Sequence, residues 1–384
     1  MDLSSDRLTK WAVSHGIKVN GIAAHRFPGK GLGVIAKRRL KDGEVILDIP
    51  MSMIRTAETV PSTIREAVKG ACSANGYLAA ELAMDTSEST ALWRTTLPST
   101  DDLTTSMPLC WPPELQALLP PAALALLRKQ QKKLSRDWSA VSAAFPQLGY
   151  DAYRCSWLLV STRTFYYTPP DMKPEDTPEA DECLALVPFG DYINHADAAT
   201  CKVAFSGTSY EFTVEGAVAK GEELYISYGS HSNDFLLVEY GFTLDKNKCD
   251  VVSLDSVILP LFSEKQKGML EEAGYWANYV LENPSMQDDE VACYRTRVAL
   301  RLLCMPLKKW RDCVRYGADD DDKYRSSVHD LLRQAMKAYL EVVDSSLEQL
   351  ARLGEVGLSV QREVLRRRWE EIGMYLSTAI DRIE

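Results

Sequence analysis

The chain has 384 residues, of which 46% are hydrophobic and 26% are charged, and its formal net charge is −10. This length and composition are those of a globular protein with two or three domains. The negative charge argues against a nucleic-acid partner, because binding to a phosphate backbone draws on a surplus of basic residues. No run approaches the roughly 18 apolar residues that cross a bilayer, so we expect no membrane partner.

The nine cysteines and five histidines show no metal-binding or redox pattern. No two cysteines have Cys-x-x-Cys spacing and no His-Glu-x-x-His sequence occurs, so we expect no metal site. An odd number of irregularly spaced cysteines is typical of reduced thiols in an intracellular protein. The first residues, MDLSSDRLTKW, contain no apolar segment of signal-peptide length. We therefore expect a cytoplasmic or nuclear protein.

The N-terminal region is predicted to form a short helix followed by two strands. Residues 5–16 carry apolar side chains on one helical face, and Gly16 stands where a helix would end. Residues 34–36 and 45–47 are short apolar runs on either side of the turn sequence Asp42-Gly43. Because Asp-Gly between two such runs is a strong hairpin signal, we expect these strands to pair with each other.

The glycine-rich stretch GKGLGVIA, residues 29–36, fits the pattern G-x-G-x-x-A from Gly31 onward. In dinucleotide-binding proteins such glycines let the backbone approach a pyrophosphate, and Asp48 follows at a suitable distance. That fold requires a helix of about ten residues directly after the loop. Only residues 37–41 fit before the Asp42-Gly43 turn, which argues against the alternative of a nicotinamide or flavin enzyme.

Helical and strand-forming regions then alternate. Residues 62–84 and 114–145 are helical in character, with Ser62 as the expected cap of the first and Pro120-Pro121 starting the longer helix. Residues 168–182 contain four prolines and many acids, which predicts a surface loop. β character returns at residues 183–229, where a turn at Ser206-Gly207 separates two strands.

From about residue 255 onward the sequence predicts a separate helical domain. Apolar side chains recur at helical spacing in residues 263–281, 290–305, 324–353 and 359–382. The last of these helices contains three consecutive arginines at positions 366–368. We expect this arginine run to form a solvated helix face.

Two further stretches contain residue types that take part in catalysis. VPFGDYINHAD, residues 187–197, places Asp191, Asn194 and His195 after a β run, and ELYISYG, residues 223–229, ends in Tyr228-Gly229. An Asp–His pair also occurs in hydrolases, but no serine or cysteine lies in a G-x-S-x-G nucleophile elbow. Neither stretch identifies a reaction by itself.

Taken together and in order, the glycine-rich stretch, the Asn194-His195 pair, ELYISYG and the later EYGF (residues 239–242) resemble the SET-domain methyltransferases. The helical insert and the helical C-terminal half are similar to the subgroup typified by the Rubisco large-subunit lysine methyltransferase. The resemblance implies an α+β fold, with a knot-like SET-domain β-fold split by a helical insert and followed by a C-terminal all-α domain. It implies SET segments at residues 1–80 and 181–252, the insert at 81–180 and a helical substrate-binding domain at 253–384.

The activity that this resemblance implies is methyl transfer from S-adenosylmethionine to a protein lysine. The expected substrate is a basic, non-histone intracellular protein, such as a ribosomal protein or a translation factor, and the expected enzyme is a monomer. One type of member in the subgroup methylates histidine, but the aromatic Phe165 in STRTF favours lysine. The alternative is a SET-fold protein that binds the cofactor or a partner without catalysis.

The resemblance also assigns residues to the methyl donor. Main-chain groups of Lys30, Gly31 and Leu32 would approach its amino-acid part, and Arg163 would lie near its carboxylate. In this family the position of Lys30 usually holds a charged or polar residue.

A second group of residues matches the wall of the cofactor pocket. Asp191, Asn194 and His195 belong to the segment that lines it, and Asn194 and His195 would bond to the donor's amino group and adenine. Phe242 matches an aromatic residue that packs against the adenine.

Tyr228 matches the catalytic tyrosine, and Phe165, Phe205 and Tyr240 are candidate walls of the channel for the substrate lysine. A free lysine has a pKa near 10.4 and therefore arrives protonated, and burial in an apolar channel disfavours its charged form. Tyr228 would then align the amine with the methyl group and place its oxygen near the sulfonium.

Overall fold

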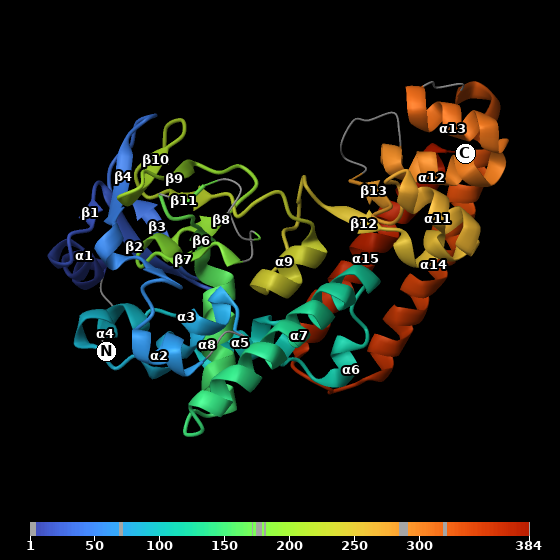
Figure 1. Ribbon diagram of the computed structural model, residues 1–384. Helices are drawn as coiled ribbons and strands as arrows, with labels where there is room; N and C mark the ends of the chain where they lie inside the picture. Colours follow the sequence, from blue (N-terminus) through green and yellow to red (C-terminus); the bar gives the residue numbers. More distant parts are fainter. Residues whose placement is uncertain are drawn as a thin grey trace. The chain divides into compact units, whose positions relative to one another are not determined.

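The computed structural model describes residues 5–68, 72–170, 172–173, 179, 182–283, 291–317 and 321–383, and Figure 1 shows its elements. Its contacts divide the chain into a first compact unit, residues 1–104 and 128–230, and a second, residues 105–127 and 231–384. These units group residues by spatial contacts, whereas the predicted domains are continuous segments of the sequence. The predicted boundaries at residues 80, 180 and 252 therefore stay a prediction. Residues 171, 174–178 and 180–181 of the predicted loop lie outside the described residues. No described helix is long and apolar enough to cross a membrane.

The described strands of the first unit form three sheets. One has the order β1 (Lys18–Val19), β4 (Val45–Pro50), β10 (Ser209–Val214), β9 (Cys201–Phe205). A second has the order β2 (Ile22–Phe27), β3 (Gly31–Ala36), β11 (Glu223–Ile226), β8 (Asn194–His195), and a third has the order β5 (Arg55–Thr56), β7 (Leu184–Leu186), β6 (Thr164–Tyr166). Fully buried side chains from both four-stranded sheets, such as Val34, Leu47 and Phe212, form the core of this unit.

The predicted pairing of residues 34–36 with residues 45–47 is wrong. β3 pairs with β2 in an antiparallel hairpin, whereas β4 pairs with β1 and β10 in another sheet. Gly43 does have the left-handed φ of 74° that a turn requires. However, Leu40 bridges to Val218 and the Gly43 N–H donates to Val214 O, so a distant segment holds residues 40–43. Because β2 ends at Phe27 and β3 begins at Gly31, the stretch GKG lies at the turn of the β2–β3 hairpin.

The helices of the first unit follow the prediction in outline. α1 (Ser5–Ser14) ends before Gly16, whose φ of 85° is left-handed as expected. The predicted helix at residues 62–84 is two helices, and the second begins at the cap Ser73, whose hydroxyl accepts from the Gly76 N–H. Pro61, not Ser62, occupies the cap position of the first. The helices after α1 are α2 (Ser62–Ala67), α3 (Ala74–Met84), α4 (Glu88–Arg94), α5 (Thr100–Ser106) and α8 (Tyr150–Arg163), with 3-10 turns η1 (Met51–Met53) and η5 (Gly190–Tyr192).

The predicted helix at residues 114–145 is also two helices, α6 (Pro113–Gln116) and α7 (Pro121–Ala144), and α7 belongs to both units. Buried Asp137 of α7 joins elements of the first unit, because its carboxylate accepts from the Ser73 hydroxyl and from Trp157 Nε1 at 3.0 Å. The sequence predicts the start of α7 correctly, since Pro121 lies in its first turn.

The second unit is mainly helical, as predicted, but it also contains a two-stranded sheet of β12 (Val251–Ser253) and β13 (Val280–Glu282). The predicted helix at 263–281 ends at Glu272 because Gly274, Ala277 and Asn278 all have positive φ. The other elements are α9 (Asn233–Tyr240), α10 (Asp255–Ile258), α11 (Glu264–Glu272), α12 (Tyr294–Cys304), α13 (Leu307–Tyr316), α14 (Asp321–Arg352) and α15 (Ser359–Arg382), with 3-10 turns η2 (Pro108–Cys110) and η6 (Leu259–Leu261). The expected α+β class is confirmed.

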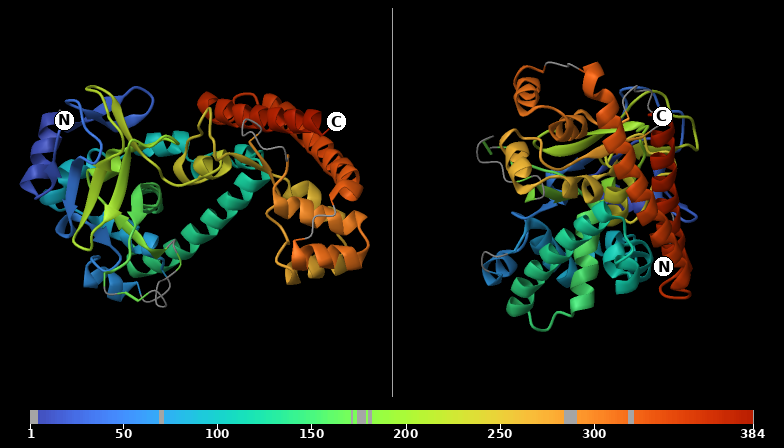
Figure 2. Two further views of the ribbon diagram at one scale, coloured as in Figure 1. Left: turned by 90° about the horizontal axis from the view of Figure 1, so that it is seen from above. Right: turned by 90° about the vertical axis from the view of Figure 1, so that its right-hand side faces the viewer.

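The helices α14 and α15 lie side by side, which Figures 1 and 2 both show. They run antiparallel, since Arg333 in α14 donates to the main-chain oxygen of Ile383 just after α15. α15 coincides with the predicted helix at 359–382. The predicted solvated arginine face is only partly correct: Arg366 and Arg367 are exposed and pair with Glu363, whereas the Arg368 side chain is completely buried.

Candidate active site

The sheet β2-β3-β11-β8 brings three of the sequence motifs together in the first unit. β8 consists of Asn194 and His195 and pairs in parallel with β11, so that Asn194 lies opposite Tyr225 and His195 opposite Ile226. β11 pairs on its other side with β3, which follows the glycine turn. Tyr228 comes two residues after the end of β11. The predicted residues Gly31, Leu32, Asn194, His195 and Tyr228 therefore share one region of one sheet.

Asn194 contacts the glycine-rich strand directly. Its Nδ2 donates to Leu32 O at 3.3 Å and to Glu223 Oε1 at 2.8 Å. A Cβ added to Gly33 would come within 2.8 Å of both Asn194 Nδ2 and Glu223 Oε1. Real Cβ atoms do not approach other atoms so closely, so any larger residue at this position would displace these side chains.

Glu223 is a site residue that the sequence analysis missed. Its carboxylate accepts from the Tyr225 hydroxyl as well as from Asn194, and its Oε2 lies 3.6 Å from Lys30 Nζ. Residues 223 and 225 share one face of a strand because side chains alternate along it. The alternation in ELYISYG could have indicated that Glu223 and Tyr225 point to the same side of the strand. It could not indicate the partner Asn194, which lies 29 residues away in the sequence.

The turn before β3 exposes its backbone. Gly31 has φ of 78°, and a Cβ added there would meet no atom within 4 Å. Lys30 is exposed and lies over the Tyr225 ring, 5.8 Å from its centroid. There is therefore open space beside the main chain at Gly31.

His195 and Tyr228 are stacked, with ring centroids 5.1 Å apart and an angle of 26° between the planes. His195 Nδ1 accepts from the Tyr228 N–H at 3.1 Å, so this nitrogen carries no proton. The Tyr228 hydroxyl donates to the main-chain oxygen of Ile193 at 3.0 Å. The hydrogen bonds at its main-chain N–H and at its hydroxyl therefore fix the position of the Tyr228 side chain at both ends.

Asp191 lies in η5 with a completely buried side chain. Its Oδ2 accepts from Trp93 Nε1 at 3.1 Å and lies 3.7 Å from Arg163 Nη1, which also donates to the Asp191 main-chain oxygen at 2.7 Å. Burial raises the pKa of Asp191 to about 6, although the Arg163 charge and the Trp93 hydrogen bond act in the opposite direction. The carboxylate thus contacts Arg163, a predicted donor-binding residue, and Trp93, which the sequence analysis missed.

The predicted channel residues of the first unit belong to one aromatic cluster. Phe165 and Phe205 are half-buried and both contact the buried Tyr210 ring, at centroid distances of 5.9 and 5.0 Å. Phe165 also contacts Phe212, whose ring fills the space where a Cβ of Gly190 would lie. The cluster therefore adjoins η5, which carries Asp191.

Tyr240 and Phe242 belong to the second unit, where their ring centroids lie 6.3 Å apart. Burial raises the pKa of Tyr240, which keeps its hydroxyl protonated. Among the described residues, no group of three or more His, Cys, Asp or Glu side chains is placed to hold a metal ion.

Two family models match this chain. The model described as "SET domain" matches residues 31–229, just over half of the chain, and the model described as "Ribosomal lysine N-methyltransferase 2 C-terminal domain" matches residues 250–378. The human SET domain-containing protein 4 is 27% identical over 377 residues, which are 90% of this chain and 83% of that protein. Ribosomal lysine N-methyltransferase set11 of Schizosaccharomyces pombe is 29% identical over 239 residues, 59% of this chain and 58% of that protein.

A solved structure has a similar fold over the full length. The structure of Rubisco LSMT bound to AdoMet superposes with a TM-score of 0.66 at 17% identity, covering 100% of this chain and 92% of that one. At this identity the likeness concerns the fold. The SET-domain match carries the assignment, because it contains the glycine-rich strand β3, the Asn194-His195 strand and Tyr228 in a single region. The chain belongs to the SET-domain family of protein-lysine N-methyltransferases, which use S-adenosylmethionine as the methyl donor.

Proposed function

We propose that this enzyme methylates a lysine of a basic, non-histone protein, and that the substrate is a ribosomal protein or a translation factor. The observation that carries this proposal is the match of residues 250–378 to the C-terminal domain of a ribosomal lysine methyltransferase. This helical region is the part that we expect to dock the substrate. The net charge of −10 favours a basic partner through electrostatic attraction.

The residues assigned to the amino-acid part of the donor fit its charged groups. S-adenosylmethionine, when bound, supplies a methyl group activated by a sulfonium, and it also carries an ammonium and a carboxylate. Asn194 Oδ1 accepts no hydrogen bond from a described residue, so it is available to the ammonium. The Arg163 guanidinium complements the carboxylate. The main chain of Lys30, Gly31 and Leu32, which has open space beside Gly31, forms the adjacent wall.

We assign His195 and Phe242 to the adenine, and Asp191 to the same pocket through its contact with Arg163. His195 is buried and holds Tyr228 through Nδ1, so it fixes the position of the tyrosine as well. Asp191 keeps Arg163 in place in two ways. Its carboxylate forms an ion pair with the guanidinium, and its main-chain oxygen accepts a hydrogen bond from Arg163 Nη1. Arg163 can then face the donor without being free to move.

Tyr228 is the proposed catalytic residue. Its single hydroxyl hydrogen is donated to Ile193 O, so the oxygen presents only lone pairs to the site. An oxygen acceptor can hold a neutral amine by one N–H and leave the amine lone pair directed at the methyl group. The same lone pairs favour the positive sulfonium, so that the tyrosine contributes both alignment and electrostatic stabilisation.

The substrate lysine must lose a proton before it can attack. We propose that Phe165, Phe205 and Tyr240 form the apolar walls that lower its pKa by disfavouring the charged ammonium. Phe165 and Phe205 contact the same Tyr210 ring, so that this part of the wall is rigid. The aromatic rings would also attract a methylated ammonium by cation–π interaction.

We further propose that residues 1–80 and 181–252 form the SET segments, that 81–180 form the insert, and that residues 253–384 bind the substrate. The enzyme acts as a monomer in the cytoplasm or the nucleus. The deciding experiment compares lysine methylation, by mass spectrometry of purified ribosomes and translation factors, in cells with and without the enzyme. The proposal requires a lysine whose methylation is lost on deletion and restored when the purified enzyme is added with S-adenosylmethionine. Loss of methylation confined to histones, or no loss at all, would contradict it.

A further inference from the structure

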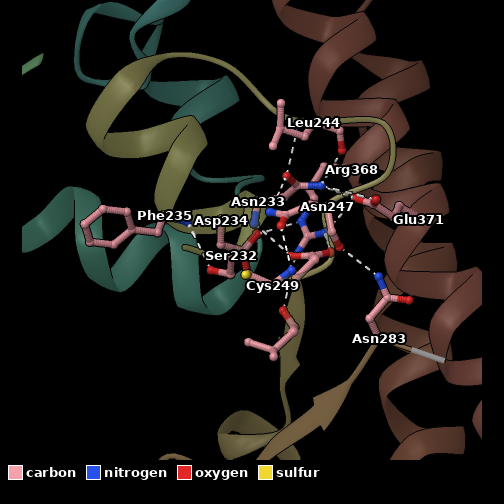
Figure 3. Close-up of polar contacts among 12 residues, drawn as sticks. Ser232, Asn233, Asp234, Phe235, Leu244, Asn247, Cys249, Asn283, Arg368 and Glu371 are labelled. Carbon is pink, nitrogen blue, oxygen red and sulfur yellow. Dashed lines mark hydrogen bonds and ion pairs between the residues drawn. The ribbon is translucent and has the colours of Figure 1, made fainter. Parts of the chain in front are cut away.

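A buried polar network in the second unit joins the two ends of the segment 233–244, which carries Tyr240 and Phe242. Figure 3 shows this network, in which side chains of α15 point toward the start of α9. The Asn233 side chain closes the segment, because Nδ2 donates to Leu244 O at 3.0 Å and Oδ1 accepts from Leu244 N at 3.1 Å. Asn233 is only 1% exposed. Both ends of the segment 233–244 are therefore fixed to each other.

The rings inside this segment are tied to α9 through the backbone. Gly241 ends the helix in the left-handed conformation, with φ of 79°, and its N–H donates to Leu237 O. The Phe242 N–H donates to Leu236 O at 3.4 Å. The positions of Tyr240 and Phe242 consequently follow the orientation of α9.

The orientation of α9 is set by carboxylates at its first turn and by α15. The Asn233 N–H donates to Asp250 Oδ1 at 2.7 Å, and Asn233 Nδ2 donates to Glu371 Oε2 at 3.0 Å. Arg368, whose side chain is completely buried, donates through Nε to Asp234 Oδ1 at 2.8 Å and through Nη1 to Asp250 Oδ2 and Glu371 Oε2, each at 2.6 Å (Figure 3). One guanidinium thus holds the three carboxylates that surround Asn233.

This arrangement fixes how α15 meets the start of α9. Buried ion pairs often add little net stability compared with apolar residues of the same volume, because the charges must leave water. They do fix one arrangement of the elements they join, since every alternative leaves a charge unpaired. Here the elements are α15 and the start of α9.

We propose that Arg368 and Glu371 are positioning residues for methyl transfer, which set the places of Tyr240 and Phe242 by holding Asn233 and Asp234. This inference rests on the proposed function, in which Phe242 packs against the adenine and Tyr240 forms part of the lysine channel. It gives α15 an indirect role in donor binding, which is exerted through the start of α9. Arg368 and Glu371 act through their contacts with Asn233 and Asp234 and through Asp250, which binds the Asn233 N–H.

The test uses the full chain and two conservative variants, Glu371→Gln and Arg368→Lys. Their matched controls are Glu370→Gln and Arg367→Lys, because these neighbours on α15 are exposed. The affinity for S-adenosylmethionine is measured by calorimetry at a temperature where circular dichroism shows each variant folded. We expect Kd to rise about tenfold for the two variants and to change less than about twofold for the controls.

A purely structural role predicts a different result. In that case the variants melt at lower temperature, but the folded protein binds S-adenosylmethionine as tightly as the wild type, and the inference is overturned. Glu371→Gln decides the question if Arg368→Lys does not fold, since glutamine keeps the shape of a side chain that is 18% exposed.

Phe242→Ala separates this inference from the proposed function. If Phe242→Ala weakens donor binding and Glu371→Gln does not, the positioning role fails while the assignment of Phe242 stands. If Phe242→Ala leaves Kd unchanged, the assignment of Phe242 to the adenine fails, and the positioning role fails with it.

Discussion

The Tyr228 hydroxyl donates its hydrogen to the main-chain oxygen of Ile193 across 3.0 Å. Ile193 directly precedes the Asn194-His195 strand, and His195 in turn binds the Tyr228 N–H. The strand that carries the proposed donor-binding residues therefore also holds the proposed catalytic tyrosine. In the proposed mechanism, donor binding and alignment of the lysine therefore depend on the same few backbone groups.

Gly33 gives the first prediction. In Gly33→Ala the new methyl group would collide with Asn194 Nδ2 and Glu223 Oε1, both 2.8 Å from its ideal position. Such overpacking would displace the Asn194 amide that we assign to the donor's ammonium, so we expect the Kd for S-adenosylmethionine to rise about tenfold. Calorimetry measures this change. The control is Gly149→Ala, where the added methyl meets no atom within 4 Å, and equal Kd values for both variants would show that the packing at Gly33 does not affect donor binding.

Glu223 gives the second. Glu223→Gln removes the charge that attracts Lys30 and weakens the hydrogen bond that orients Asn194. Because a charge-assisted bond is worth about 1 kcal/mol more than a neutral one, we expect donor affinity to fall about fivefold. The exposed neighbour Glu222 provides the control Glu222→Gln, for which we expect no loss. Unchanged affinity in Glu223→Gln would show that the carboxylate does not orient Asn194.

Asp191 gives a pH-dependent prediction. Burial raises its pKa from 3.8 to about 6, so the folded protein holds a proton that the unfolded chain releases. This contribution to stability is fully present below about pH 4 and is lost as the pH rises through about 6. Two pKa units correspond to on the order of 3 kcal/mol.

Asp191→Asn removes this titration and keeps an oxygen acceptor for Trp93 Nε1. We expect the free energy of unfolding, measured with urea, to fall less steeply in the variant than in the wild type between about pH 4 and about pH 6. Parallel curves for the two proteins would mean that Asp191 is charged throughout this range.

The elements that could be predicted from the sequence are those set by local pattern. α15 coincides with the predicted residues 359–382 because its apolar side chains recur with helical period, and Gly16 ends α1 as its position suggested. Their motifs predict Asn194, His195 and Tyr228 as site residues, and the structure places the first two in β8 and Tyr228 two residues after the neighbouring strand β11. Their chemical roles stay a proposal.

The features that could not be predicted depend on distant partners. The Asp42-Gly43 turn is present, yet residues 40–43 pair with residues 214–218. No local signal in the sequence indicates this distant partner. Arg368 looks like its two exposed neighbours in sequence, and only the packing of α15 against Asp234 and Asp250 distinguishes it. Glu223 was overlooked for the same reason, since its importance comes from Asn194.

The most direct measurement is the rate of methyl transfer by Tyr228→Phe, using radiolabelled S-adenosylmethionine and extract from cells that lack the enzyme. Loss of the hydroxyl oxygen should slow labelling at least about 100-fold, while the donor Kd changes less than about threefold. The exposed Tyr166 supplies the control Tyr166→Phe, which should label as fast as the wild type. If Tyr228→Phe labels protein at the wild-type rate, or if the wild type labels no protein at all, the catalytic account is contradicted.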